Sequence, residues 1–476
     1  MFTIVENNSF ALRDVDWFVE QLNALSSFDP GRDVIVTRAP GRLDVIGGIA
    51  DYSGSLVLEM PIAEATFAAI QRNSSGTIEI TTIEEQISTF EMPLEDLRFD
   101  DEPLDLASAK NYFAKRNDGD WVRYVAGVFF VLGKQLGVRF TEGAKIVVAS
   151  RVPIGKGVSS SAALEVSVMQ AVCFAHEIDI APRDLALLCQ TVENHIVGAA
   201  CGVMDQISTH RGEPGKLTAI VCQPAEIRGS IDIPDGIEFW GIDSGVRHAV
   251  SGSDYSSVRI GAFMGYRIIA ELAGLDARQV GEGNVEIDDE RWNGYLANVS
   301  PEEYEKEFRD KLPDSMDGQE FLSLYLGTTD TVTSVDADKT YAIKTPTEHA
   351  IYENWRVHRF AELMMNQFDK AGELMFASHE SYKACGLTES RTDRIVDLVK
   401  SRRDKGLFGA RITGGGSGGT VGVLARRGSR DAIEELAAQL EKETGEKPYI
   451  FHGSSPGCSL FGSVRLRSQK EGIRNA

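Results

Sequence analysis

A glycine- and serine-rich segment that runs into a long apolar helix is the feature that most limits how this chain can fold. Gly155 and Gly157 predict a loop whose backbone approaches a ligand closely. Residues 162–177 contain no glycine or proline, and apolar residues recur there at spacings of three and four, which predicts a helix with one apolar face. Three serines, at 159–161, stand where this helix would begin. Free N–H groups at a helix start bind phosphate, although a serine-capped core helix is the plainer alternative.

The composition predicts a two-domain cytoplasmic protein and disfavours two classes of partner. A length of 476 residues allows two domains, each with its own core. The 71 acidic and 49 basic side chains give a net charge of −22, which repels nucleic acid and anionic membrane surfaces. The start of the chain lacks the pattern of a secretion signal, and no apolar run reaches the roughly 20 residues of a membrane helix. The six cysteines form no C-x-x-C pair, as expected of free thiols in a reducing compartment.

A charged, glycine-dense stretch follows the first predicted strand. Residues 34–37 predict a short strand, and residues 38–54 then carry Arg42, Asp44 and Asp51 among glycines, which predicts a loop. Charged side chains in a loop between apolar strands are candidate site residues, with a surface hairpin as the alternative.

The remainder of the chain predicts alternating strands and helices, with a domain boundary just before residue 236. Residues 276–350 are acidic and mixed, and we interpret them as an elaboration of the second domain, not as a third domain. Strands are predicted at 56–71, 77–91, 144–149, 236–244, 449–452 and 459–467, and helices at 10–28, 121–136, 182–197, 256–275, 353–402 and 428–444.

Two further turns hold candidate site residues. Asp205 lies in a turn of small residues, where an aspartate is usually only a turn residue. Residues 411–424 form a glycine-rich turn that feeds a strand. Because no helix follows this turn, it favours neither a dinucleotide-binding fold nor the nucleophile elbow of an α/β-hydrolase. The sequence also contains no Walker A motif and none of the protein-kinase motifs.

Five stretches, in order along the chain, resemble motifs of the GHMP kinases (galacto-, homoserine, mevalonate and phosphomevalonate kinases). Within that family, residues 47–58 and 193–199 are similar to the L-arabinokinases. The five stretches are residues 39–52, which resemble the sugar-binding motif of galactokinases; 152–163, which resemble the phosphate-binding motif; 201–206; 243–248 with Tyr255; and 413–419, which resemble the third motif.

The resemblance implies an α+β fold with the GHMP kinase architecture. Members have two lobes with the active site between them, a ribosomal-protein-S5-like N-terminal domain and a ferredoxin-like C-terminal domain. We assign residues 1–235 to the first domain and residues 236–476, with the elaboration at about 276–350, to the second. The resemblance also implies ATP and Mg²⁺ as cofactors and a small sugar as substrate. We expect a monomer without nucleic-acid or membrane partners.

The resemblance implies a role for each candidate residue. Asp205 would lie beside the anomeric hydroxyl that attacks the γ-phosphate, and Arg42 would offset charge on the transferred phosphoryl group. Ser160 or Ser161 with Glu193 would hold Mg²⁺, which prefers hard oxygen ligands. The implied sugar contacts are Gly48, Asp51, Gly202, Asp205 and Tyr255, and the implied ATP contacts are Gly155, Gly157, Val158, Ser159, Ser160, Ser161 and Ala162.

Two departures from the galactokinase motif predict a pentose substrate. Galactokinases have a glutamate that meets the C6 hydroxyl of galactose where this chain has Gly48, and Ile49 replaces the histidine that follows. L-Arabinopyranose lacks the C6 hydroxymethyl group, so its site needs no such partner. We therefore predict an L-arabinose 1-kinase, with a galactokinase, another pentose 1-kinase or a non-catalytic sugar sensor as alternatives. Asp44 replaces an asparagine of galactokinases, and nothing in the sequence explains this change.

Overall fold

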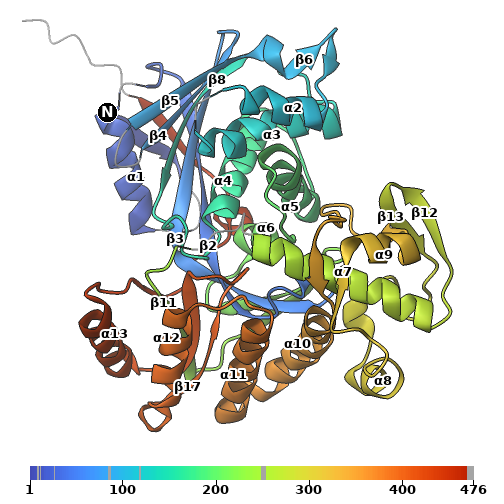
Figure 1. The fold of residues 1–476 in the computed structure, drawn as a ribbon. Helices are drawn as coiled ribbons and strands as arrows, with labels where there is room; N and C mark the ends of the chain where they lie inside the picture. Colours follow the sequence, from blue (N-terminus) through green and yellow to red (C-terminus); the bar gives the residue numbers. More distant parts are fainter. Residues whose placement is uncertain are drawn as a thin grey trace, which may run out of the picture.

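The chain folds into two lobes, each built on its own β-sheet, with a smaller unit beside the second lobe (Figure 1). The structure, a computed structural model, describes residues 1–7, 10, 12–25, 27–83, 87–116, 119–247 and 253–468. The α+β fold expected from the motifs is confirmed. Within the described ranges, no helix combines the length and the apolar character needed to cross a membrane.

A nine-stranded sheet forms the centre of the first lobe. Its strands follow the order β1-β20-β2-β3-β8-β4-β5, and β9 and β10 extend it beside β3. Only β4 and β8 run parallel to each other. The strands are β1 Phe2–Glu6, β2 Asp33–Ile46, β3 Leu56–Asn73, β4 Thr77–Ile83, β5 Ile87–Pro93, β8 Gly143–Ser150, β9 Lys216–Val221, β10 Glu226–Asp232 and β20 Val464–Ser468, and a separate small ribbon pairs β6 Arg98–Phe99 with β7 Glu102–Pro103.

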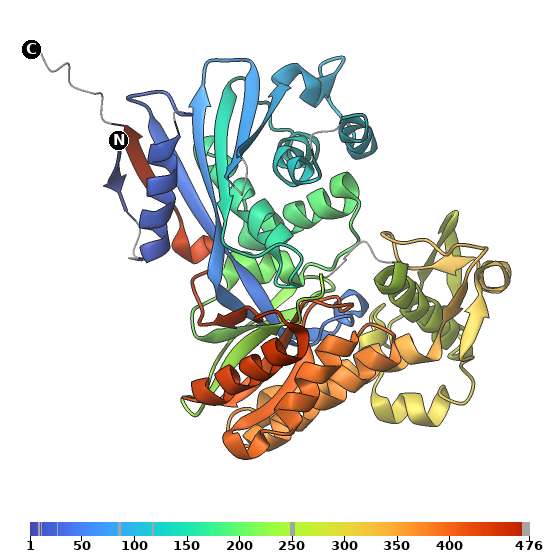
Figure 2. The same ribbon diagram turned by 60° about the vertical axis from the view of Figure 1, so that its left-hand side comes forward.

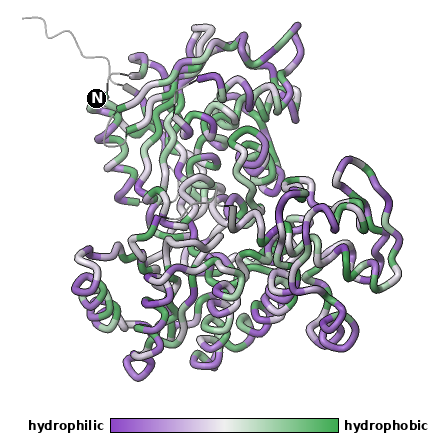
Figure 3. Tube along the Cα trace, in the orientation of Figure 1, coloured by the Kyte–Doolittle hydropathy of each residue, from purple (hydrophilic) through white to green (hydrophobic). Residues whose placement is uncertain are grey.

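Helices cover both faces of this sheet (Figures 1 and 2). Along β3, Phe67 and Ala69 join the core beneath α1, whereas Ala68 and Ile70 join the core beneath α3 and α4, as the two-residue period of a strand requires. Apolar residues gather between the layers (Figure 3). The helices are α1 Arg13–Ala24, α2 Leu106–Ala114, α3 Trp121–Leu136, α4 Ser160–Ala175, α5 Pro182–Thr191, α6 Met204–Arg211 and α14 Cys458–Phe461.

The structure confirms one predicted helix with its exact bounds and divides another into two parts. The helix predicted at 121–136 is α3 with the same bounds. The helix predicted at 182–197 is divided, because α5 ends at Thr191 and a π-helical turn, Val192–Val197, continues it. This wider turn carries Glu193, in keeping with the frequent occurrence of π-turns at functional sites.

Strand β2 is longer than the sequence predicted and corrects the predicted loop at 38–54. It has 14 residues and pairs with β3 from Ile35 to Ile46, with register irregularities between Pro40 and Arg42 and between Asp44 and Ile46. Such bulges accommodate proline and glycine within a strand. Arg42 and Asp44 therefore lie on one face of a rigid strand, and not in a loop.

An antiparallel sheet in the order β17-β18-β11-β19 forms the second lobe. The helices of this lobe pack around it in two apolar clusters. The elements are β11 Ile237–Asp243, β17 Leu407–Ile412, β18 Thr420–Arg426, β19 Ile450–His452, α10 Lys344–Leu363, α11 Phe368–Ala384, α12 Ser390–Lys400 and α13 Arg430–Thr444. The chain then returns to the first lobe, where β20 pairs with β1 and β2, so the predicted span 236–476 includes a strand of the first sheet.

The acidic elaboration forms the smaller unit beside α7, Ser253–Leu272 (Figures 1 and 2). Its buried Trp292, Tyr304 and Phe321 share one core with Ile49 and Tyr52 of the predicted sugar motif. The elaboration therefore packs directly against the sugar motif. Its elements are β12 Ala277–Gly281, β13 Gly283–Ile287, α8 Pro301–Glu307, β14 Ser315–Asp317, α9 Gly318–Tyr325, β15 Gly327–Thr328 and β16 Thr340–Ala342.

Candidate functional site

A cavity of about 210 Å³ lies where the starts of α4 and α6 meet α7 and the glycine-rich turn between β17 and β18. Most of the predicted site residues line it, although they come from segments far apart in the sequence. The lining residues are Arg42, Ile49, Asp51, Tyr124, Ile154, Gly155, Gly157, Ser159, Ser160, Ser161, Glu193, Ala200, Cys201, Gly202, Met204, Asp205, Arg247, Tyr255 and Gly415.

The predicted phosphate loop joins β8 to the start of α4. Gly155, Gly157 and Ser159 have φ angles of 74°, 70° and 59°, in the left-handed region. This curvature turns the loop around the end of α4, where the first N–H groups of the helix are free. The hydroxyl of Ser159 is buried and has no hydrogen-bond partner among the described residues. A concave loop with free donors at a helix start suits an anion.

Not every residue of the predicted ATP set lines the cavity. Ser159, Ser160 and Ser161 do, but Val158 and Ala162 are buried, with 1% and 0% exposure, and Val158 lies in an apolar cluster. Contact of these two residues with ATP would involve main-chain atoms, and it stays a prediction. Val158 contributes instead through its carbonyl, which accepts a hydrogen bond from the main chain of Arg42 at 3.1 Å.

Glu193 and Ser161 lie together at the edge of the cavity, where a hydrogen bond links their side chains. Burial raises the pKa of Glu193 to about 7, and Asp205 adds to the rise, while hydrogen bonds from Ser161, Cys201 and Gln206 oppose it. The salt bridges of the described residues include none to Glu193. A buried carboxylate beside a hydroxyl, without a cationic partner, fits a divalent cation with oxygen ligands. No cluster of three or more His, Cys, Asp or Glu side chains suited to a metal occurs in the described ranges.

Arg42 links the predicted proton acceptor to the phosphate loop. Its Nε donates to Oδ1 of Asp205 at 2.9 Å, and its Nη1 donates to the carbonyl of Gly157 at 2.8 Å. Arg42 is 3% exposed, whereas Asp205 is 19% exposed and is the member of the pair that opens to the cavity. Burial alone would lower the pKa of Arg42, but Asp205, Glu59 and Asp44 raise it above its usual value.

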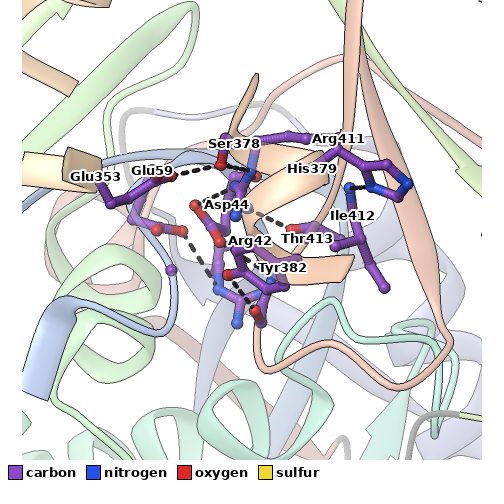
Figure 4. A network of polar contacts seen from close by, with 12 residues as sticks. Arg42, Asp44, Glu59, Glu353, Ser378, His379, Tyr382, Arg411, Ile412 and Thr413 are labelled. Atoms are coloured by element: carbon purple, nitrogen blue, oxygen red, sulfur yellow. Dashed lines mark hydrogen bonds and ion pairs between the residues drawn. The ribbon is translucent and has the colours of Figure 1, made fainter. Parts of the chain in front are cut away.

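A buried network of charges supports Arg42 from behind (Figure 4). Oε2 of Glu59 lies 3.3 Å from Nε of Arg42, and Glu59 is fully buried. Burial raises the pKa of Glu59 well above its usual range; Asp44 adds to this rise, and Arg42 opposes it. Glu59 lies opposite Asp44 in the pairing of β2 with β3. Sequence reasoning missed Glu59, because a single glutamate in a predicted strand carries no motif.

The same network joins the first motif to the third. Arg411 of β17 lies 2.9 Å from Oδ1 of Asp44, and both side chains are 0% exposed. The main chain of Asp44 donates to Oγ1 of Thr413, and Gly414 donates to Oδ2 of Asp44. These contacts span up to 370 positions in the sequence. These contacts explain why this chain has Asp44 where galactokinases have an asparagine. The negative charge of Asp44 pairs with Arg411, and a neutral asparagine could not form this ion pair.

Gly48 does not line the cavity, which corrects its prediction as a sugar contact. A Cβ atom at this position would lie 2.2 Å from Oδ2 of Asp44 and 2.3 Å from Oη of Tyr382. Tyr382 is fully buried and donates to the carbonyl of Gly414 at 2.8 Å, and His349 donates to the carbonyl of Gly48 at 3.1 Å. Residue 48 must be glycine because Asp44 and Tyr382 fill the space beside it.

The end of the cavity where we predict that the sugar binds, called the sugar end below, centres on Asp51. This residue begins a short 3₁₀ helix, Asp51–Ser53, is 1% exposed, and accepts no hydrogen bond from another side chain in the described part of the chain. Burial raises its pKa to about 7, an effect that Arg259 opposes. A Cβ atom on Gly202 would lie 1.6 Å from Oδ2 of Asp51, so only glycine fits there. Ile49 and Tyr255 complete this end.

Several lining residues were not among the predicted contacts. Arg247 lines the cavity, and its Cγ atom would lie 2.8 Å from a Cβ atom on Gly155. The signal for Arg247 was its place in the matched stretch 243–248, of which residue 248 lies outside the described residues. Ile154 likewise belongs to the matched stretch 152–163, whereas Tyr124 carried no signal, because it lies in a predicted helix outside every matched stretch.

Comparison with protein families finds three matches, spread along the chain. Residues 123–213 match the GHMP kinases N terminal domain, residues 360–447 match the GHMP kinases C terminal domain, and residues 26–72 match the galactokinase galactose-binding signature.

Two curated relatives extend over most of this chain. An L-arabinokinase of Arabidopsis thaliana is 46% identical over 492 residues, which cover 92% of this chain and 47% of that protein. The chain thus spans about half the length of that relative. A galactokinase of Chloroflexus aggregans is 30% identical over 410 residues, covering 85% of this chain and 86% of that protein.

Solved structures share the fold. The structure of Lactococcus lactis galactokinase complexed with galactose aligns with a TM-score of 0.72 at 19% identity, covering 94% of this chain and 99% of that one. Mevalonate kinase of Methanococcus jannaschii aligns with a TM-score of 0.54 at 17% identity, covering 91% and 98%.

Proposed function

The chain belongs to the GHMP kinase family, and we propose that it transfers the γ-phosphate of ATP to the anomeric hydroxyl of L-arabinose. The observation that carries the proposal is the hydrogen-bonded Arg42–Asp205 pair, which adjoins the phosphate loop on one side and shares a cavity with Asp51 on the other. Phosphoryl transfer depends mainly on positioning and charge stabilisation, and this cavity offers groups for both.

In the proposed reaction, Asp205 accepts or polarises the proton of the attacking hydroxyl. Arg42, which donates both to Asp205 and to the phosphate loop, offsets the charge that spreads over the transferred phosphoryl group. Because Arg42 is almost fully buried, its charge is screened less than it would be in water. Asp51 accepts hydrogen bonds from the sugar hydroxyls.

ATP would bind with its phosphates on residues 155–161, where the glycines allow close approach of the backbone and the serines offer hydroxyls. Ser160 or Ser161 with Glu193 would hold Mg²⁺. When bound, the cation neutralises charge on the phosphates and orients them.

L-Arabinose as the substrate rests on two observations. The 46% identical relative is named an L-arabinokinase, and the likeness covers 92% of this chain. In the cavity, Ile49 presents an apolar branched side chain, so a C6 hydroxymethyl group against it would lose water without gaining a hydrogen bond. Of the two departures from the galactokinase motif, Gly48 and Ile49, it is Ile49 that lines the cavity and supports this argument.

Initial rates of ADP release with L-arabinose and with D-galactose, at matched concentrations of MgATP, test this proposal. We expect kcat/KM for L-arabinose to exceed that for D-galactose by about 5- to 150-fold, which corresponds to one unpaired buried hydroxyl. Equal or greater efficiency with galactose would overturn the substrate assignment. Absence of ADP release with either sugar would overturn the enzymatic proposal in favour of a sugar sensor.

Galactose is the second candidate, because residues 26–72 match the galactokinase galactose-binding signature. The ADP-release assay with L-arabinose and D-galactose distinguishes the two candidate substrates. A monomeric state and a cytoplasmic location stay predictions, and light scattering during size-exclusion chromatography tests the first.

A further inference from the structure

A buried ion pair connects the acidic elaboration to the sugar end of the cavity. Nε and Nη2 of Arg259 donate to the two carboxylate oxygens of Asp330, each at 2.7 Å. The two side chains are 4% and 2% exposed. Arg259 lies one helical turn beyond Tyr255 on α7, whereas Asp330 follows β15 within the elaboration. The bidentate geometry fixes the plane of the guanidinium group.

Asp330 is itself held firmly. The main-chain N–H groups of Val332 and Thr333 donate to its carboxylate, and Oγ1 of Thr333 donates to Oδ2 at 2.6 Å. Asn284 of β13 donates to its carbonyl at 2.6 Å. Burial raises the pKa of Asp330, but the hydrogen bonds and charge of Arg259 outweigh burial and hold this pKa below its usual value. Asp330 is therefore a rigid, ionised partner.

Arg259 also lies close to Asp51 without binding it. Its guanidinium carbon is 5.3 Å from the ring centroid of Tyr52, the residue that follows Asp51. Nη1 of Arg259 has no hydrogen-bond partner among the described residues, and no other described side chain donates to Asp51. A buried guanidinium without a counter-ion would be drawn to the nearest carboxylate, because an unpaired buried charge is costly. Because Asp330 already pairs with Arg259, the guanidinium group is not drawn to Asp51.

We propose that Asp330 is a positioning residue for the sugar site, which holds Arg259 in an orientation that leaves both carboxylate oxygens of Asp51 free for substrate hydroxyls. The inference rests on the proposed function, in which Asp51 contacts the sugar. It assigns a role to the acidic elaboration, which reaches from the surface of the second lobe to the substrate.

The surroundings of Asp51 decide how its pKa responds to changes at Asp330. Burial raises this pKa to about 7, and the charge of Arg259 opposes this rise. Removal of the Asp330 charge leaves the charge of Arg259 uncompensated, so the pKa of Asp51 falls. Removal of both charges takes away the lowering by Arg259, so the pKa rises. The other titratable groups that interact with Asp51 are Asp44, Asp205, Tyr52, Tyr255, Cys222 and Tyr382.

The test is the pH dependence of kcat/KM for sugar in wild type, Asp330→Asn and the double variant Arg259→Gln/Asp330→Asn. For Asp330→Asn we expect KM for sugar to rise about 10-fold or more, while kcat and KM for ATP change less than about threefold. The acidic limb of the profile should move to lower pH in the single variant and to higher pH in the double variant, each by about one unit. A merely structural role would not reverse this direction.

Asp338→Asn is the matched control, because it makes the same chemical change on an exposed residue of the same segment, and it should leave all parameters unchanged. Asp330→Glu should recover part of the sugar affinity. An unchanged KM for sugar in a folded Asp330→Asn, or equal losses for sugar and ATP, would overturn the proposal. If Asp330→Asn does not fold, the double variant decides: an acidic limb at or below that of wild type would overturn the proposal.

A failure of the proposal for Asp330 can be distinguished from a failure of the proposed function. If D-galactose is the better substrate, the substrate assignment fails, and the same variants measured with D-galactose test Asp330. If neither sugar is phosphorylated, isothermal titration of each sugar as a function of pH replaces kcat/KM.

Discussion

The two ends of the cavity are built in different ways. The phosphate end is one continuous segment, residues 155–161, which offers free N–H groups, serine hydroxyls and glycines with positive φ. The sugar end combines Ile49, Asp51, Gly202 and Tyr255 from separate elements, and its carboxylate is almost fully buried. Arg42 and Asp205 stand between the two ends.

This difference follows from the chemistry of the two proposed substrates. Backbone dipoles at a helix start attract a polyanion and need no buried charge. A neutral sugar is recognised by directed hydrogen bonds, and a strong acceptor such as a carboxylate must be kept buried and free before the sugar arrives. The loop itself therefore needs no buried charge, whereas the buried carboxylates beside it, Asp51 at the sugar end and Glu193 next to Ser161, cost stability in the absence of ligand.

The largest expected effect lies at the junction of the two ends. Asp205→Asn should lower kcat by about 10²–10⁴-fold, because a positioned proton acceptor is lost. ATP affinity should stay within about threefold, since the phosphate end does not depend on this carboxylate. Steady-state kinetics with fluorescence titration of a nucleotide analogue measures both quantities.

Asp184→Asn is the control for this change, because Asp184 also lies in the first turn of a helix and is 58% exposed. A variant of Asp205 that retained more than about a tenth of the wild-type rate would show that this residue does not handle the proton.

Behind the sugar end, Gly48→Glu should lower the free energy of unfolding by about 2–4 kcal/mol. The new side chain meets Asp44 and Tyr382, and its carboxylate is forced beside a buried negative charge. Because this side chain points away from the cavity, the ratio of kcat/KM for the two sugars should not move toward galactose. Urea denaturation and the two-sugar assay test these expectations.

Gly76→Glu is the matched control, since a Cβ atom at Gly76 meets nothing within 4 Å. A stable Gly48→Glu protein with a gain in galactose turnover would show that residue 48 faces the sugar after all.

The smallest expected effect is a change in the free energy of unfolding when the buried, unpaired carboxylate of Asp51 is removed. Burial raises its pKa from an ordinary value of 3.8 to about 7, so the folded state holds the proton more tightly than the unfolded state. Stability without ligand should therefore fall as pH rises from about 4 to about 7. Asp51→Asn should be more stable than wild type by about 1–3 kcal/mol at pH 8, and this difference should nearly vanish at about pH 4.

Urea denaturation at the two pH values measures this difference, and the variant should also lose sugar affinity. A pH-independent difference in stability between Asp51→Asn and wild type would mean that Asp51 carries no such cost, and the contrast between the two ends of the cavity would not hold.

Much of the fold was predictable because its signals are local. The helix at 121–136 and the start of α4 follow from apolar periodicity within about four turns, and the phosphate loop follows from its glycines and serines. The resemblance to GHMP kinases identified Arg42, Asp205 and Asp51 as candidates, and all three line one cavity. The length of β2 was not predictable, because pairing with β3 overrides the local turn signals of its proline and glycine.

The sequence by itself determined the family, the phosphate loop and the residue types that the chemistry requires. The tertiary structure alone decided which way residue 48 faces and what Asp44 does. The side of residue 48 depends on a turn in which Gly47 and Ile49 both have positive φ, at 119° and 51°. Tyr382 beside residue 48 and Arg411 beside Asp44 come from elements more than 300 positions away. Spacing in a sequence carries no information about such contacts, because buried charges find their partners only when distant elements pack together.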